Sequence, residues 1–263
     1  MQLAAAFAAM TCSATMAAGP GRPLLAPRVL PVPLVRRRSS APAAIVPLNS
    51  TDSRVCNIDE RCIFFVTGNA KKELEVNSML RDPKNDIAPY RLTHVDIDLP
   101  ELQGQINDAG ALDIARAKCM EASRQVGGSA VIVEDTSLCF GALNGLPGPY
   151  IKWFWDSLGN DGLWRMLESC TDQSAFCRCV LAYSPGEEEE PLLFVGTTHG
   201  KIVAPSGDGG FGWDAIFVPD GYDTPFAVMP LAEKNKISHR SRALMQFIEH
   251  CQEEARAEAA ELW

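Results

Sequence analysis

The stretch CIFFVTGNAKKELEVNSMLR, residues 62–81, decides the fold class because it joins a strand to a helix through a tight turn. CIFFVT is a run of aromatic and β-branched residues, which is typical of a buried strand. Gly68 and Asn69 predict a turn, and the remainder of the stretch predicts a helix. A strand that passes directly into a helix is the building unit of α/β proteins.

The next segments continue the alternation of strands and helices. HVDIDL (residues 94–99) alternates like a second strand, and AVIVED (130–135) is a further buried strand. Between them, residues 110–126 carry apolar side chains at helical spacing. The stretch from Lys152 to Cys170 predicts one or two amphipathic helices that are broken at Gly159.

Three strands then follow one another without an intervening helix. They are SAFCRCVLAYS (174–184), PLLFVGTTHGKIVAP (191–205) and GWDAIFVP (212–219). A last helix begins near Ser238, a residue type that favours the N-cap position. The mixture predicts an α/β fold with a mixed β-sheet flanked by helices.

The N-terminal segment differs in composition from the rest of the chain. Residues 1–50 contain no acidic residue and are rich in Ala, Pro, Ser and Arg, which is typical of a disordered mitochondrial or plastid presequence. We expect a folded domain at 51–263, located in a plastid or mitochondrion, or in the cytoplasm if the extension carries no address. No apolar run reaches the roughly 18 residues that span a bilayer, so we expect no membrane association.

The charge balance argues against a nucleic-acid-binding protein, and the cysteine spacing argues against a zinc site or a disulfide framework. The chain has a net charge of -9, and without the five arginines of the N-terminal segment 19 basic residues face 33 acidic ones. A nucleic-acid interface needs a basic face, so any phosphate site here must be local. The nine cysteines contain no CxxC pair, which favours reduced thiols over a zinc site or a disulfide framework.

The motif VTGNAKK, residues 66–72, is a candidate phosphate-binding turn. A strand, a glycine turn and a helix start together present backbone N–H groups to an anion. The P-loop pattern GxxxxGK[ST] is absent. Lys71 and Lys72 can equally be solvated helix residues, so this motif alone leaves both interpretations open.

Carboxylates follow two of the expected strands. Glu134 and Asp135 end the strand AVIVED, and Glu101 lies just past HVDIDL. Open α/β sheets hold ligands at this end of their strands, and Mg²⁺ takes one or two carboxylates together with phosphate oxygens. Adjacent strand residues point to opposite faces, so at most one of Glu134 and Asp135 is expected to face the crevice. The alternative is a strand end with a solvated acid.

FGWDAIFVPDGY (211–222) and AEKNKISHR (232–240) combine aromatic rings with charge. The aromatic residues offer faces on which a planar base can stack, and the cationic ones suit a phosphate or a carbonyl. Each residue alone is more simply a core aromatic, a surface lysine or a helix cap. Their combination favours a site for an anionic ligand.

Four motifs in this order resemble the inosine triphosphate pyrophosphatase family, whose members are also called HAM1-like proteins. They are FVTGNAKK, EDTSLCFGALNGLPGPYIKWF, FGWDAIFVPDGY and AEKNKISHRSRAL, which with the segments between them cover about residues 61–250. The resemblance implies an elongated mixed sheet with two lobes and a central nucleotide-binding cleft. It also implies a homodimer that hydrolyses ITP, dITP and XTP to the monophosphate and pyrophosphate with Mg²⁺, for which Mn²⁺ can substitute.

The resemblance also implies a role for individual residues. Asp135 and Lys72 are the candidate catalytic residues, and Glu101 and Asp135 the candidate metal ligands. Phe211 would stack on the base, and His239 with Arg240 would read the 6-oxo edge. The candidate substrate-binding residues are Thr67, Gly68, Asn69, Ala70, Lys71, Lys72, Lys118, Asp135, Thr136, Lys152, Phe211, Gly212, Trp213, Asp214, Lys234, Ser238, His239 and Arg240.

Two alternatives differ from this function. A Maf-like pyrophosphatase would prefer modified pyrimidine or methylated nucleotides, and the SHR motif at Ser238–Arg240 argues against it. A nucleotide sensor would bind purine nucleotides without hydrolysing them. The loss of metal-binding carboxylates would mark such a protein, but Glu101 and Asp135 are both present.

Overall fold

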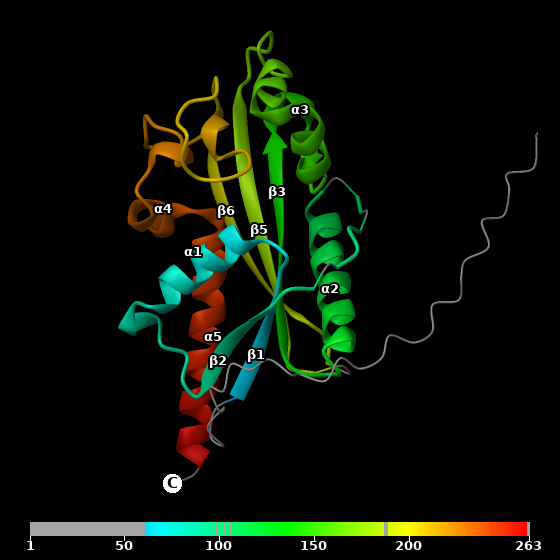
Figure 1. Cartoon of the computed structure of the whole chain (residues 1–263), viewed down its shortest axis with the longest axis vertical. Helices are drawn as coiled ribbons and strands as arrows, with labels where there is room; N and C mark the ends of the chain where they lie inside the picture. Colours follow the sequence, from blue (N-terminus) through cyan, green and yellow to red (C-terminus); the bar gives the residue numbers. More distant parts are fainter. Residues whose placement is uncertain (1–60, 98, 103, 106, 187–188, 262–263) are drawn as a thin grey trace, which may run out of the picture. The chain divides into compact units, whose positions relative to one another are not determined.

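A mixed sheet of seven strands organises the chain (Figure 1). The computed structural model describes residues 61–97, 99–102, 104–105, 107–186 and 189–261. The strand order is β2-β1-β3-β5-β6-β7, with β4 paired to β3. The strands are β1 (Arg61–Val66), β2 (Tyr90–Val95), β3 (Val131–Phe140), β4 (Pro147–Gly148), β5 (Ser174–Ser184), β6 (Leu192–Ile202) and β7 (Phe217–Pro219).

Strand β3 is paired unequally along its two edges. Along one edge it pairs with β5 over its whole length, from Val131 to Phe140. Along the other edge it pairs with the parallel strand β1 only at Val131–Val133, and with β4 only at Leu138 and Cys139. The segment 134–137 therefore forms an open edge just beyond the carboxyl end of β1.

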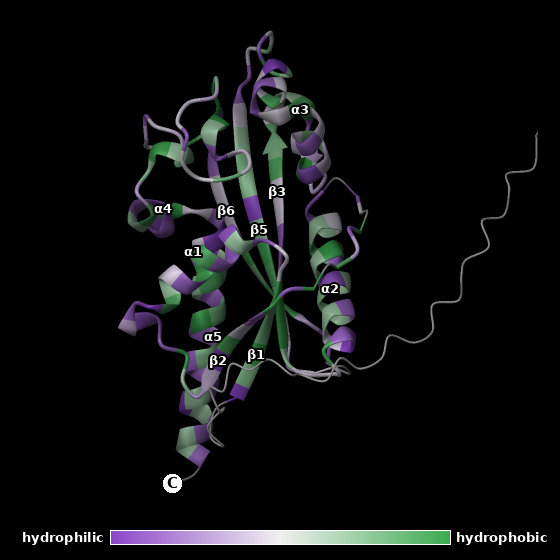
Figure 2. Cartoon of the chain, viewed as in Figure 1, coloured by the Kyte–Doolittle hydropathy of each residue, from purple (hydrophilic) through white to green (hydrophobic). Residues whose placement is uncertain are grey.

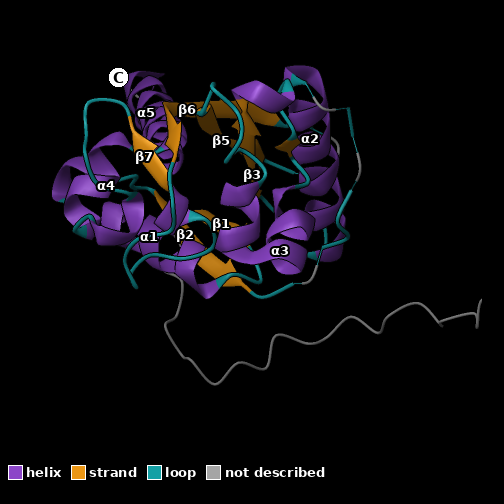
Figure 3. Ribbon diagram, turned by 90° about the horizontal axis from the view of Figure 1, so that it is seen from above, coloured by secondary structure: helices purple, strands orange, loops and turns teal. Residues whose placement is uncertain are grey.

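Helices cover both faces of the sheet, as Figure 3 shows from above. Helix α2 packs on β3 and β5 from one face, while α5 packs on β5 and β6 from the other. Apolar and polar residues alternate around both helices (Figure 2), as expected for helices with one buried side. The helices are α1 (Ala70–Leu80), α2 (Asp108–Gln125), α3 (Ile151–Arg165), α4 (Leu231–Ile237) and α5 (His239–Glu261).

Polar side chains fix where the helices begin. The side-chain oxygen of Asn69 accepts hydrogen bonds from the N–H groups of Lys71 and Lys72 at the start of α1. Ser238 Oγ accepts the N–H of Ser241 at 3.1 Å at the start of α5, as predicted for an N-cap. Gly159 interrupts α3 with φ 62°, a left-handed conformation that favours glycine, and this confirms the predicted break.

The expectation of an α/β fold with a mixed sheet is confirmed, but the chain departs from it in three places. Strand β2 ends at Val95, so most of HVDIDL lies beyond it. Asp214 lies in a 3₁₀ turn (Asp214–Ile216) instead of a strand, because only the residues after it pair with β6. The short helix α4 was not predicted, since a Pro-Leu start and mixed charges give a weak periodic signal.

The proposed presequence at residues 1–50 lies outside the described residues, and the folded domain proposed at 51–263 is described only from residue 61. Among the helices that the structure describes, none is long and apolar enough to cross a bilayer.

Candidate active site

A pocket of about 540 Å³ lies beyond the carboxyl end of β1 and around the open edge of β3. Because this edge is unpaired, side chains from both faces of β3 reach the pocket. Glu134 and Asp135 both line it, so the prediction that at most one faces the crevice was wrong. The polar and charged residues of its lining are Thr67, Asn69, Lys71, Lys72, Glu101, Lys118, Glu134, Asp135, Thr136, Lys152, Asp156, Asp214, His239 and Arg240.

The turn between β1 and α1 forms one wall of the pocket. Of the substrate-binding candidates in this turn, Thr67, Gly68, Asn69, Lys71 and Lys72 line the pocket, whereas Ala70 does not. The backbone N–H groups at the start of α1 bond to the Asn69 side chain at 3.0 and 3.3 Å. An anion bound here would therefore compete with Asn69 for these donors.

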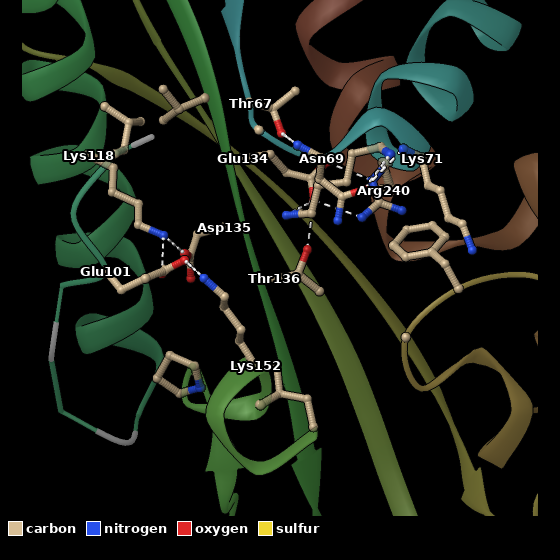
Figure 4. A pocket seen from close by; sticks show the side chains of 18 of the residues that line it. Thr67, Asn69, Lys71, Glu101, Lys118, Glu134, Asp135, Thr136, Lys152 and Arg240 are labelled. Atoms are coloured by element: carbon tan, nitrogen blue, oxygen red, sulfur yellow. Dashed lines mark hydrogen bonds and ion pairs between the residues drawn. The ribbon is translucent and has the colours of Figure 1, made fainter. Parts of the chain in front are cut away.

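Two carboxylates and two lysines meet on the α2 side of the pocket (Figure 4). Lys118 Nζ donates to Glu101 at 2.9 Å and to Asp135 at 2.8 Å, and Lys152 Nζ donates to the second Glu101 oxygen at 2.9 Å. Burial opposes the ionisation of Glu101, but the two lysines outweigh it and lower its pKa. Burial likewise opposes the charge of Lys118, but its two carboxylate partners raise its pKa.

This pair of carboxylates fits a magnesium ion. No group of three His, Cys, Asp or Glu side chains suited to a metal occurs within the described residues. Mg²⁺ needs only one or two carboxylates when water and phosphate oxygens complete its shell. Glu101 and Asp135 contact the same Lys118 nitrogen, so their oxygens converge on one point that an ion can occupy in its place.

A buried ion network occupies the opposite side of β3. Arg240 Nε and Nη2 donate to the two oxygens of Glu134 at 2.6 and 2.8 Å, and Arg240 Nη1 also donates to Glu75. Lys72 contacts Glu134 at 3.1 Å. Although burial opposes the charge of Glu134, Arg240 and Lys72 hold its pKa well below the ordinary value. Glu134 and Arg240 are therefore both charged inside the protein, since the carboxylates also raise the pKa of Arg240 against its burial.

Two predicted substrate-binding residues of the last motif do not line the pocket. Lys234 is only 3% exposed, and its Nζ donates to Glu75 at 2.8 Å and to Asp214 at 2.7 Å. Lys234 therefore lies behind the pocket wall, where its ammonium group pairs with Asp214 of the lining. Ser238 serves as the N-cap of α5, with its hydroxyl bonded within the first turn.

The loop that contains Phe211 forms a second wall of the pocket, where the Gly210 carbonyl accepts a hydrogen bond from Lys71 of α1 at 3.1 Å. Phe211, Gly212, Trp213 and Asp214, all candidate substrate-binding residues, line the pocket. The Phe211 N–H donates to Asp214 at 2.8 Å, which fixes the backbone that carries the ring. Its ring has Lys71, Lys234 and Arg240 within 5.9, 5.0 and 5.4 Å of its centroid, so a planar ligand on this ring lies close to cations.

His239 lies in the same wall and is 2% exposed. Its ring packs 5.4 Å from Trp213 and 6.4 Å from Phe226, between ring centroids. Nδ1 lies 3.2 Å from Cys177 Sγ, whereas Nε2 has no hydrogen-bond partner among the described residues. Burial and the neighbouring Arg240 charge hold the pKa of His239 well below its ordinary value, so the ring is neutral at pH 7.

Among the charged residues of the lining, sequence reasoning missed Asp156, and it also missed three residues that contact the lining. Glu75 joins Lys234 to Arg240, and its signal is its place on the buried stripe of α1 beside Val76. Asn160 donates to the Gly212 carbonyl at 3.0 Å, just after the predicted helix break. Cys177 gave no signal beyond an apolar strand.

Fold and site together define an α/β protein with a charged pocket suited to a polyanionic ligand and a divalent cation. Residues 63–250 match the model of the Ham1 family, so the chain belongs to this family. The resemblance inferred from the four motifs is thereby confirmed at the family level.

Solved structures of several relatives share the fold at 27% sequence identity. A HAM1 protein from Coxiella burnetii matches with a TM-score of 0.62, over 73% of this chain and 99% of its own. The Ham1 protein of Staphylococcus aureus matches with a TM-score of 0.59, over 74% and 100%. A nucleoside-triphosphatase, or dITP/XTP pyrophosphatase, from Mycobacterium abscessus matches with a TM-score of 0.53, over 71% and 97%.

Proposed function

We propose that the chain hydrolyses non-standard purine nucleoside triphosphates (ITP, dITP and XTP) to the monophosphate and pyrophosphate. The observation that carries this proposal is one pocket with a carboxylate pair on one side of β3 and an aromatic wall with His239 and Arg240 on the other. The Mycobacterium abscessus relative is named as a dITP/XTP pyrophosphatase, which supports the same activity.

The phosphates would lie between the β1–α1 turn and the carboxylate pair. Lys72, Lys118 and Lys152 would stabilise the negative charge that develops on phosphate oxygens when water attacks between the α- and β-phosphates. Mg²⁺ held by Glu101 and Asp135 would supply further charge neutralisation there. Asp135 would orient the attacking water and accept its proton, since its carboxylate faces the pocket beside Lys118.

The base would lie on Phe211 with its 6-position toward His239. Hydrogen-bond donors in this wall suit the 6-oxo group of inosine and xanthosine, whereas adenosine presents an amino donor there. A donor that faces another donor leaves both unpaired, which costs about 1–3 kcal/mol for each buried group. Such mismatches would exclude ATP.

We propose in addition that the protein forms a homodimer and acts in a plastid or mitochondrion after removal of its N-terminal segment. The motif resemblance supports the dimer, and the composition of residues 1–50 supports the location.

The reaction is tested by identifying its products. Full-length protein is incubated with Mg²⁺ and ITP, and ³¹P NMR follows the phosphorus species. The proposal requires pyrophosphate and inosine monophosphate, and no signal change with an Asp135→Asn variant. Orthophosphate with the diphosphate would contradict it, because a different bond would then be cleaved. Tight ITP binding without any product would favour a nucleotide sensor, and a preference for modified pyrimidine nucleotides would favour a Maf-like enzyme.

A further inference from the structure

The imidazole of His239 is fixed in orientation by its surroundings. Trp213 and Phe226 pack beside it, and the side chain is 98% removed from solvent. Rotation of the ring would require the aromatic rings of this cluster to move. One nitrogen therefore always faces Cys177, and the other, Nε2, is buried without a hydrogen-bond partner among the described residues, in a residue that lines the pocket.

A neutral imidazole carries a single proton, so what Nε2 offers to a ligand depends on what occupies Nδ1. If Nδ1 carries the proton, Nε2 is an acceptor and suits an amino group. If Nδ1 is unprotonated, Nε2–H is a donor and suits a carbonyl oxygen.

Cys177 is the group that faces Nδ1. Its Sγ, on β5, lies 3.2 Å from His239 Nδ1 and 3.6 Å from the carbonyl oxygen of Thr198 on β6. A thiol has one hydrogen to donate and sulfur is a weak acceptor, whereas an imidazole nitrogen is a good acceptor. Donation of the S–H to Nδ1 uses the shorter contact and the better acceptor. Burial also raises the pKa of the Cys177 thiol, which keeps this hydrogen in place at neutral pH.

We propose that Cys177 is a positioning residue that fixes His239 as the Nε2–H tautomer, so that a hydrogen-bond donor faces the 6-position of the bound base. This inference rests on the proposed function, which it deepens. Under this inference, part of the preference for 6-oxopurines depends on the buried Cys177 thiol, which acts through His239 and does not contact the nucleotide.

Two substitutions separate hydrogen bonding from packing. Cys177→Ser keeps a donor of nearly the same size, whereas Cys177→Ala removes it. Cys251→Ala is the matched control, because Cys251 is an equally buried thiol on α5. The full-length chain is labelled with ¹⁵N-histidine, and long-range ¹H–¹⁵N spectra report the tautomer of His239. A His239→Asn spectrum assigns its signals among the four histidines.

We expect the Nε2–H tautomer in the wild type, in Cys177→Ser and in the control, and a mixture of tautomers in Cys177→Ala. The ratio of kcat/KM for ITP to that for ATP should fall about tenfold in Cys177→Ala, as expected for one lost hydrogen bond, and should recover in Cys177→Ser. An Nδ1–H tautomer in the wild type would overturn the inference, and so would an unchanged tautomer and an unchanged ratio in Cys177→Ala.

The two proposals fail separately. The spectra are recorded without nucleotide, so they test the role of Cys177 even if the protein does not hydrolyse ITP. In that case the ratio of the Kd values for ATP and ITP replaces the ratio of kcat/KM values. If Cys177→Ala does not fold, the tautomers of the wild type and Cys177→Ser decide the inference.

Discussion

Arg240 and Glu134 form a bidentate ion pair in the interior of the protein. Two guanidinium nitrogens lie 2.6 and 2.8 Å from the two carboxylate oxygens, although the residues are 106 positions apart in the sequence. Both side chains are at most 3% exposed. The pair joins α5 to the open edge of β3 and so fixes the pocket wall that contains His239 relative to the strand that carries Asp135.

Removal of one charge from this pair should destabilise the fold. Loss of one partner of a buried pair typically costs about 3–5 kcal/mol, because the other charge stays buried without compensation. We therefore expect Glu134→Gln to lower the free energy of unfolding by this amount in urea titrations. Glu190→Gln removes an exposed partner of Arg116 and should cost less than about 1 kcal/mol. Equal effects of the two substitutions would contradict the buried network.

His239 should make stability depend on pH. Its pKa in the folded protein lies well below the ordinary value of 6.5 because of burial and Arg240. As pH falls below 6.5 the unfolded chain binds a proton that the folded protein does not, so the free energy of unfolding decreases. The slope for one proton is about 1.4 kcal/mol per pH unit.

Chemical unfolding at pH values from 7.5 to 5 tests this effect. The His239→Gln variant should lose less stability than the wild type over this range, and the exposed His199→Gln control should follow the wild type. A His239→Gln curve parallel to that of the wild type would contradict this, because it would show that His239 binds its proton equally well in the folded and unfolded protein.

Gly196 on β6 should determine where α5 begins. A Cβ atom at this position would lie 1.9 Å from the His239 carbonyl oxygen and 2.6 Å from the Ala243 nitrogen. Gly196→Ala must therefore displace the first turn of α5, with a loss of about 1–3 kcal/mol in stability. We expect kcat/KM for ITP to fall at least tenfold in the folded variant. Gly186→Ala, whose Cβ would meet its nearest neighbour at 3.6 Å, should be close to neutral.

Asn160 should act on substrate binding. Its side chain donates to the Gly212 carbonyl and accepts from Trp155 Nε1, so it ties the Phe211 loop to α3. Asn160→Ala removes the hydrogen bond to Gly212. The loss of a hydrogen bond worth about 1 kcal/mol should raise the KM for ITP about fivefold. The exposed Asn77→Ala change is the control. A drop in kcat with KM unchanged would place Asn160 in the chemical step instead.

The sequence predicted the residues that line the pocket better than the contacts among them. Strand β5 was predictable because its burial imposes a run of mostly apolar residues. The environment of Lys234 was not predictable, because its partners Glu75 and Asp214 are distant in sequence and meet it only when α1 and α4 pack together. That both Glu134 and Asp135 line the pocket depends on where β1 stops pairing with β3, which no local pattern encodes.

The most direct test of the central claim compares ITP with ATP in steady-state hydrolysis with Mg²⁺, for the wild type and for Asp135→Asn. We expect kcat/KM for ITP to exceed that for ATP by at least about 100-fold, which corresponds to two or more mismatched buried hydrogen bonds. Activity should disappear when EDTA removes the metal and when Asp135 is replaced. Equal rates with ITP and ATP, or full activity of Asp135→Asn, would contradict the proposed function.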